Sequence, residues 1–322
     1  MKKFFKYLLV FLIVVGAVFL LGPRPDTNTT VTFDPASLPA DLDAYLADSE
    51  KSIANLTPGA EKQIIWNNPD TKEKTDIAIV FMHGFSATNR EIRPVPDRVA
   101  KSLSANLYFT RFKGHGRDGE GLAEATTEAW ANDAAEAMAI GERLGEKVII
   151  ISVSTGGTLA TWTAAQPDLT DKLAGIAFIS PNFAVNSLPT WLPNIPWAET
   201  IFPAVFGSER SWEPKNEEHG KWWTRNYPTK AIFPMTSYLK VVDAIDKSAL
   251  STPALFMYSD ADTVVDPKVT AKAAKQWGGP SQTVKVTSSD DPNNHVIAGD
   301  IMSPGNNFLA IKTIVTWIKQ LK

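Results

Sequence analysis

The chain has 322 residues, of which 44% are hydrophobic and 21% charged, so it has the composition of a folded globular protein rather than a disordered or fibrous one. Its formal net charge of -3 gives no reason to expect a nucleic-acid partner, since phosphate binding needs a basic surface. The chain contains no cysteine, which excludes disulfides, thiolate catalysis and cysteine-ligated zinc.

The first 22 residues have the charge order of a membrane anchor or a secretory signal. Lys2, Lys3 and Lys6 precede an almost unbroken apolar run from Tyr7 to Leu21. The run approaches the length of about 17–25 residues that spans a bilayer, and no small-x-small cleavage site follows it. We therefore favour an uncleaved anchor over a removed signal. Either one places the remaining chain on the extracytoplasmic side, periplasmic in a Gram-negative cell, and cleavage would make the protein secreted.

Residues 23–60 are expected to form a tether and a short helix. The stretch from Pro23 to about Pro39 is rich in Pro, Thr, Asp and Asn and has no sustained apolar period, as in a linker. Between Asp41 and Asn55, a helix would place Leu42, Tyr45 and Leu46 on one face.

The rest of the chain alternates short β-rich runs with amphipathic segments of helical length. Most of the runs are continuously apolar, as in strands that are covered by helices on both faces. This alternation predicts an α/β fold with a mostly parallel, doubly wound sheet, built from residues 61–180 and 251–322. The expected strands are Gln63–Trp66, Ile77–Met82, Leu107–Arg111, Val148–Ser152, Ile176–Ile179, Ala254–Tyr258 and Val284–Thr287. The expected helices are Glu91–Leu103, Glu128–Leu144, Gly156–Ala165, Lys268–Trp277 and Asn307–Gln320.

Residues 181–250 form an insertion between the two parts of the predicted sheet domain. The segment loses the strand pattern and becomes rich in Pro and Trp. Because so many indoles need burial, we expect a small helical cap packed over the edge of the sheet rather than a loose surface excursion. The tryptophans include Trp191, Trp197, Trp212, Trp222 and Trp223.

A serine between a β-run and a helical segment is the strongest sign of chemistry. Ser152, Ser154 and Gly156 form the pattern S-x-S-x-G. A tight strand-to-helix turn of this kind projects the hydroxyl of Ser154 from the sheet edge toward a base. The usual pattern is G-x-S-x-G, so Ser152 is a departure that concerns the geometry just below the predicted nucleophile.

The expected base and acid follow the serine, because this fold orders its triad as Ser, then Asp or Glu, then His. His295 lies in a loop after the last predicted strand and is the preferred base. His219 lies in a polar patch of the insertion, where a solvated surface histidine is expected. Asp260 and Asp262, both after the preceding strand, remain alternatives for the acid, whereas Asp266 is explained as a helix N-cap.

Stabilisation of an acyl-transfer oxyanion requires two backbone N–H groups. One should belong to Thr155, which follows the nucleophile. The other should come from the loop after the strand at 77–82, where Phe85 is the candidate. We expect His83, in the same loop, and His115, in a later turn, to have structural roles.

These motifs together resemble the α/β-hydrolase superfamily and, within it, bacterial monoacylglycerol lipases and carboxylesterases. They are HGFS at 83–86, GHG at 114–116, STGG at 154–157, SDADTVVDP at 259–267 and NNHVI at 293–297, in the order and spacing of that family. The resemblance extends from about Ile77 to the C-terminus. It implies that the acid is Asp262, in D-x-V-V, and that the oxyanion donors are Phe85 and Thr155.

The predicted function is hydrolysis of a carboxylic ester by Ser154, His295 and Asp262. An aromatic cap and a membrane tether suggest a hydrophobic, lipid-like acyl substrate. Thioester or amide hydrolysis on the same scaffold is an alternative, because a fold does not fix its substrate. A catalytically silent, membrane-anchored binding protein is a second alternative. No cofactor or metal is expected, since the histidines are dispersed along the chain.

Overall fold

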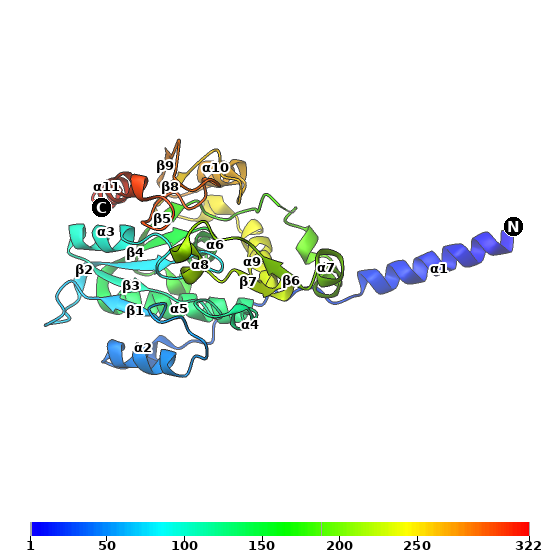
Figure 1. Cartoon of the computed structure of the whole chain (residues 1–322), viewed down its shortest axis with the longest axis horizontal. Helices are drawn as coiled ribbons and strands as arrows, with labels where there is room; N and C mark the ends of the chain where they lie inside the picture. The colour runs from blue at the N-terminus through cyan, green and yellow to red at the C-terminus, as the bar shows by residue number, and fades with distance from the viewer. Residues whose placement is uncertain (1, 188, 322) are drawn as a thin grey trace.

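The computed structural model describes residues 2–187 and 189–321 (Figure 1). A seven-stranded sheet of order β1-β3-β2-β4-β5-β8-β9 lies at its centre. Strand β1 is antiparallel to β3, and every other neighbouring pair is parallel, so the predicted α/β fold with a mostly parallel sheet is confirmed. The strands are β1 Gln63–Ile65, β2 Thr75–Met82, β3 Asn106–Phe109, β4 Gly145–Val153, β5 Leu173–Ile179, β8 Ala254–Tyr258 and β9 Ser281–Lys285.

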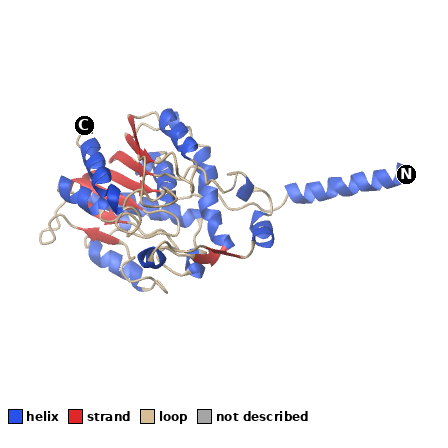
Figure 2. Cartoon of the chain, turned by 45° about the horizontal axis from the view of Figure 1, so that its top comes forward, coloured by secondary structure: helices blue, strands red, loops and turns tan. Residues whose placement is uncertain are grey.

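Helices cover both faces of the sheet, which explains the continuous apolar runs (Figure 2). Successive side chains of a strand point to opposite faces. In β4, Val148 and Ile150 therefore join one core, whereas Ile149 and Ile151 join the other. The first core includes side chains of α5 Thr127–Leu144, α6 Thr155–Ala164 and α10 Pro267–Gln276. The second includes side chains of α3 Val95–Leu103 and α11 Asn307–Ile318.

Several predicted boundaries differ from the structure, and two of the differences have a clear physical reason. The helix predicted from Glu91 begins at Val95, because Pro94 and Pro96 lack the N–H groups that a helix interior needs and a proline fits only the first turn. The strand predicted at Val284–Thr287 is instead β9, which starts at Ser281. This strand lies at the edge of the sheet and most of its side chains are exposed, so no apolar pattern marks its start.

The segment between β5 and β8 holds a cap that is mainly helical, as expected. Its helices are α7 Ala198–Phe206, α8 Glu217–Trp222 and α9 Phe233–Asp243. It also contains a small antiparallel sheet of β6 Glu209–Ser211 and β7 Asn226–Pro228, which the sequence did not predict because each strand has only three residues. Trp222 and Trp223 are buried as expected, but Trp191 is 66% exposed, so the expected burial of its indole is wrong.

Helix α1 (Lys2–Leu20) extends away from the rest of the molecule (Figure 1). It buries no side chain and is long and apolar enough to cross a membrane, a test that signal sequences also pass. The end of α1 contacts the cap, because Trp197 Nε1 donates to the carbonyl of Val18 (3.2 Å) and Trp197 N–H donates to that of Pro23 (2.6 Å). The apolar helix therefore leaves the molecule beside the cap.

The segment predicted as a tether packs against the core over its second half. Phe33 N–H donates to Asn132 Oδ1 of α5 (2.7 Å), and Leu38 is buried. Helix α2 (Leu42–Lys51) follows and buries Leu42 and Leu46 in the same core as α5. This part of the chain is thus an additional layer of the α/β unit.

Candidate active site

Ser154 occupies a sharp turn between β4 and α6. Its φ of 49° and ψ of -118° lie in a region that side chains rarely adopt, so the turn is strained at this residue. Two hydrogen bonds hold it, from Ser154 N–H to the Ile179 carbonyl (3.1 Å) and from Asn182 N–H to the Ser154 carbonyl (2.9 Å). The Ser154 side chain lines a cavity of about 730 Å³ between core and cap.

The small residue two positions after Ser154 is required by close packing. A Cβ atom on Gly156 would lie 2.7 Å from the His83 carbonyl oxygen and still closer to that of Met82. Ser152, two positions before, is fully buried, and its hydroxyl donates to the Ala177 carbonyl at 3.4 Å. The departure from glycine at Ser152 is therefore accommodated within the sheet.

His295 and Asp262 form a buried pair in the same region. His295 Nδ1 lies 2.8 Å from Asp262 Oδ2. The other carboxylate oxygen of Asp262 accepts N–H groups from Val264 (2.8 Å) and Val265 (3.0 Å). The carboxylate is thus fixed by its own loop and presents one oxygen to the imidazole.

Asp291 shapes the loop that carries His295 and was not predicted. Its buried carboxylate accepts N–H groups from Asn293 (3.0 Å), His295 (3.2 Å) and Val296 (2.9 Å). An Asp that precedes a Pro-Asn-Asn stretch is typical of turns in which the side chain binds nearby backbone, and this signal could have identified it.

The charges around His295 favour its protonated form. Burial of the imidazole opposes protonation, but the hydrogen bond and the charge of Asp262 outweigh burial, with further contributions from Glu91 and Asp291. The pKa of His295 is therefore raised above its ordinary value of 6.5. The surroundings of His295 thus stabilise the imidazolium that forms when it accepts a proton.

The other two candidate carboxylates lie elsewhere. Asp260 is exposed and pairs with Lys285 on β9. Asp266 caps α10, where it accepts the N–H of Lys268 at 2.8 Å, as the sequence predicts. Of the three carboxylates in this loop, Asp262 is the one that contacts His295.

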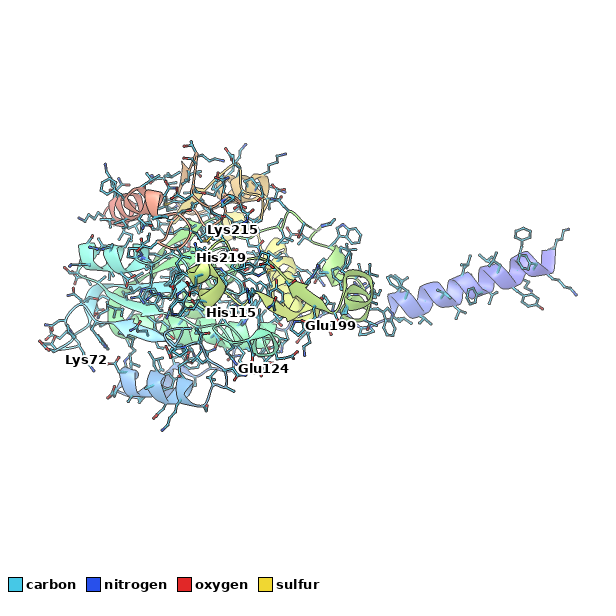
Figure 3. All side chains as sticks on the ribbon, in the orientation of Figure 1. Lys72, His115, Glu124, Glu199, Lys215 and His219 are labelled. Carbon is cyan, nitrogen blue, oxygen red and sulfur yellow. The ribbon has the colours of Figure 1, made fainter. Side chains whose placement is uncertain are left out.

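His219 is not the solvated surface histidine that the sequence suggests. It lies on α8 (Figure 3), with its ring centroid 4.5 Å from that of Trp212 and 4.7 Å from that of Trp223. Burial between the two indoles lowers the pKa of His219 to about 4. Its role is packing within the cap.

His83 orders the loop that contains Phe85. Its Nε2 accepts the N–H of Phe112 (3.2 Å), so its Nδ1 carries the proton and donates to the Gly84 carbonyl (2.9 Å). Burial lowers the pKa of His83 to about 4, which keeps the ring neutral. His115 is also buried, with its ring 4.7 Å from that of His83, and both histidines thus have the surroundings of structural residues.

Phe85 and Thr155 line the same cavity as Ser154 and His295. Among the described residues, neither backbone N–H donates to a protein acceptor. Thr155 begins α6, so its N–H also lies at the positive end of a helix. The structure thus brings a serine, a histidine–aspartate pair and two free backbone donors to one cavity.

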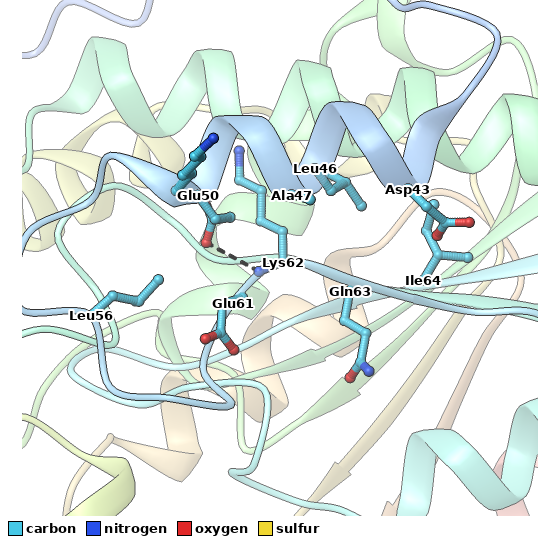
Figure 4. A pocket seen from close by; sticks show the side chains of 10 residues that line it. Asp43, Leu46, Ala47, Glu50, Leu56, Glu61, Lys62, Gln63 and Ile64 are labelled. Carbon is cyan, nitrogen blue, oxygen red and sulfur yellow. Dashed lines mark hydrogen bonds between the residues drawn. The ribbon is translucent and has the colours of Figure 1, made fainter.

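A second cavity, of about 650 Å³, lies between α2 and β1 (Figure 4). It is lined by charged and apolar residues, and Lys62 N–H donates there to Glu50 Oε2 (3.2 Å). None of its lining residues is a serine or a histidine, so it offers no nucleophile and base. Within residues 2–187 and 189–321, no group of three or more His, Asp and Glu side chains is placed to hold a metal ion.

The fold and the site geometry define a hydrolase of the α/β-hydrolase class. The chain belongs to the serine aminopeptidase S33 family, whose profile matches residues 73–289. The predicted membership in the α/β-hydrolase superfamily is therefore confirmed.

The relatives of this chain include lipases. It is 25% identical to a thermostable monoacylglycerol lipase of Bacillus sp. (strain H-257) over 201 residues, which cover 62% of this chain and 76% of the relative. The metagenome-derived lipolytic enzymes LipS and LipT provide a similar fold, with a TM-score of 0.64 and 20% identity over 82% of this chain and 100% of the other. The monoacylglycerol lipase of Paleococcus ferrophilus has a TM-score of 0.58 and 14% identity over 81% and 98% of the two chains. The protein is thus a serine hydrolase of lipase and esterase type.

Proposed function

We propose that this protein cleaves carboxylic esters through Ser154 as nucleophile, His295 as base and Asp262 as orienting acid. The main support is the 2.8 Å contact between His295 Nδ1 and Asp262 Oδ2 beside the cavity that Ser154 lines. A carboxylate at Nδ1 requires the proton on that nitrogen, which leaves Nε2 free to accept the serine proton.

In the proposed reaction, Ser154 Oγ attacks the ester carbonyl while His295 Nε2 takes its proton. The negative charge that develops on the carbonyl oxygen is bound by the N–H groups of Phe85 and Thr155, each worth about 10²–10³-fold in rate. His295 then protonates the leaving alcohol as the ester C–O bond breaks. Water, activated by His295, hydrolyses the acyl-serine and restores the free hydroxyl.

The described structure contains no hydrogen bond between Ser154 Oγ and His295 Nε2. Such contacts often form only in the substrate complex. Asp262 and the loop bound by Asp291 hold His295 in place. We expect the contact to close when an acyl group fills the cavity.

A hydrophobic acyl chain is the substrate part that fits this cavity best. The cavity has room for a chain of moderate length, and its walls are mainly apolar and aromatic. They include Phe85, Trp212, Trp223, Tyr227, Ile232 and Met235, most of them from the cap. An aliphatic chain would gain free energy there by removing apolar surface from water.

We also propose that α1 is a membrane anchor that holds the site near a lipid surface. The helix buries no side chain, and its lysines lie at its beginning, which favours an extracytoplasmic position for the catalytic part. Its end contacts Trp197 of the cap, and the exposed side chains of Trp191 and Val205 lie on that cap as well. Lipid-like esters would then be close to the cavity.

The test is hydrolysis of p-nitrophenyl esters from acetyl to palmitoyl by the full chain in detergent, beside Ser154→Ala. Ser102→Ala, on the exposed side of α3, is the matched control. We expect activity in the parent and in the control, none in Ser154→Ala, and a preference for medium or long chains. Equal activity of the parent and Ser154→Ala would contradict the triad, and a flat chain-length profile would contradict the hydrophobic substrate.

The same measurement separates the alternatives. Thioester or amide hydrolysis would use the same residues, so thioester and aminoacyl anilide substrates belong in the panel. A folded parent that is inert on every substrate would instead favour a silent binding protein.

A further inference from the structure

Glu91 is a buried carboxylate at the proposed active site to which the reaction above assigns no role. It is 2% exposed and lines the same cavity as Ser154 and His295. Neither neighbouring arginine neutralises it, because Arg90 lies over the Trp222 ring and Arg93 pairs with Asp97. Within the described part of the chain, no cation forms a salt bridge with it. A buried, unpaired charge of this kind is costly and calls for an explanation.

The carboxylate of Glu91 holds the loop that carries the proposed oxyanion donor. Its Oε2 accepts the N–H of Gly84 at 2.6 Å. Its Oε1 is so close to Gly84 that a Cβ atom on that residue would lie 2.7 Å away. On the other side, His83 Nδ1 donates to the Gly84 carbonyl, which is part of the Gly84–Phe85 peptide group. Gly84 is therefore held at both its N–H and its carbonyl, and the carbonyl shares a peptide plane with Phe85 N–H.

Glu91 also acts on the proposed base. The titratable group that faces it across the cavity is His295, and each favours the charged form of the other. Burial nevertheless raises the pKa of Glu91 to about 7, against the Gly84 hydrogen bond and the charge of His295. The carboxylate is ionised above about pH 7, and in that state its charge can stabilise the imidazolium that forms during the reaction.

We propose that Glu91 is a positioning residue for ester hydrolysis, which aims Phe85 N–H through Gly84 and stabilises protonated His295 by its charge. The inference rests on the proposed function of Ser154 and His295. It predicts two separable effects, one that needs only a hydrogen-bond acceptor and one that needs a negative charge.

Two substitutions in the full chain separate these effects. Glu91→Gln keeps an acceptor for Gly84 N–H but removes the charge, whereas Glu91→Leu removes both. Asp133→Asn is the control, because Asp133 is a partly buried carboxylate that also accepts a backbone N–H, from Lys113 (2.6 Å), but lies outside the cavity.

We expect Glu91→Gln to keep kcat within about threefold of the parent at alkaline pH, and Glu91→Leu to lose about 10–100-fold in kcat with little change in KM. Removal of the anion lowers the pKa of His295, so the acid limb of kcat/KM should move down by about half a pH unit in Glu91→Gln. Asp133→Asn should leave the acid limb in place.

The proposal is overturned if the pH profile of Glu91→Gln superimposes on that of the parent, and this result is decisive even if Glu91→Leu does not fold. It is also overturned if a folded Glu91→Leu, checked by circular dichroism, keeps the parent kcat. If Ser154→Ala is inactive in the same assays, such results reject the role of Glu91 alone. If Ser154→Ala is as active as the parent, the proposed function itself is rejected.

Discussion

Gly156→Ala tests whether the turn at Ser154 depends on close contact between α6 and β2. The added Cβ would lie 2.7 Å from the His83 carbonyl oxygen and nearer to that of Met82. A comfortable contact needs about 3.5 Å, so α6 or the end of β2 must move by about 1 Å. Both atoms belong to the backbone, which leaves no flexible side chain to yield.

A displacement of about 1 Å at a reacting group costs about 100-fold in rate, and overpacking of this kind costs about 1–3 kcal/mol of stability. We therefore expect kcat of Gly156→Ala to fall about 100-fold on a good ester substrate while the protein stays folded. Esterase kinetics and thermal unfolding measure the two effects.

Gly220→Ala is the matched control, because its added Cβ would meet only Pro214 side-chain atoms at 3.3 Å. It should keep the parent kcat. An active Gly156→Ala with unchanged kcat would show that the elbow tolerates displacement, and would refute the argument that its geometry is fixed by backbone contact.

Three further predictions concern the triad, the buried carboxylate and the anchor. Asp262→Asn would place an amide donor against His295 Nδ1–H, so the ring should change tautomer and kcat should fall about 10³–10⁴-fold; a loss below tenfold in steady-state kinetics would contradict the orienting role. The pKa of Glu91 is raised from 4.5 to about 7. Burial of its charge therefore leaves the free energy of unfolding unchanged below the unfolded pKa, where the carboxyl group is protonated in both states, and lowers it by up to about 3 kcal/mol above pH 7. Glu91→Gln should therefore unfold at higher denaturant concentration than the parent near pH 8 and show no gain near pH 4.5, whereas an equal gain at both values would contradict this sign. Finally, the full chain expressed in bacteria should stay in the membrane fraction after alkaline carbonate and leave it in detergent; release by carbonate would show that α1 does not span the bilayer.

The sheet could be predicted from the sequence because its strands are buried on both faces. The runs Val148–Ile151 and Ala254–Tyr258 are continuously apolar, and the structure has strands there. Edge and cap strands carry no such pattern. For this reason the strand predicted at Val284–Thr287 lies later in the chain than β9, which is Ser281–Lys285. Strands β6 and β7 were not predicted, because their pairing depends on contacts within the cap.

The candidate site was partly predictable for a different reason. Ser154, Asp262 and His295 belong to short motifs in a fixed order, and the structure brings them to one region. Glu91 has no local motif and reads as an ordinary residue of a helix that in fact starts at Val95. Its contact with Gly84 arises from the turn between them, and such a contact is visible only in three dimensions.

The most direct test of the account is covalent labelling by a fluorophosphonate, which reacts with activated serines. The full chain is treated with the reagent, digested and analysed by mass spectrometry, with Ser154→Ala and Asp262→Asn alongside. We expect one adduct, on Ser154, which forms in parallel with the loss of esterase activity. It should form slowly in Asp262→Asn and be absent from Ser154→Ala. Ester hydrolysis that persists without labelling of Ser154, or an inactivating adduct on another residue, would contradict it.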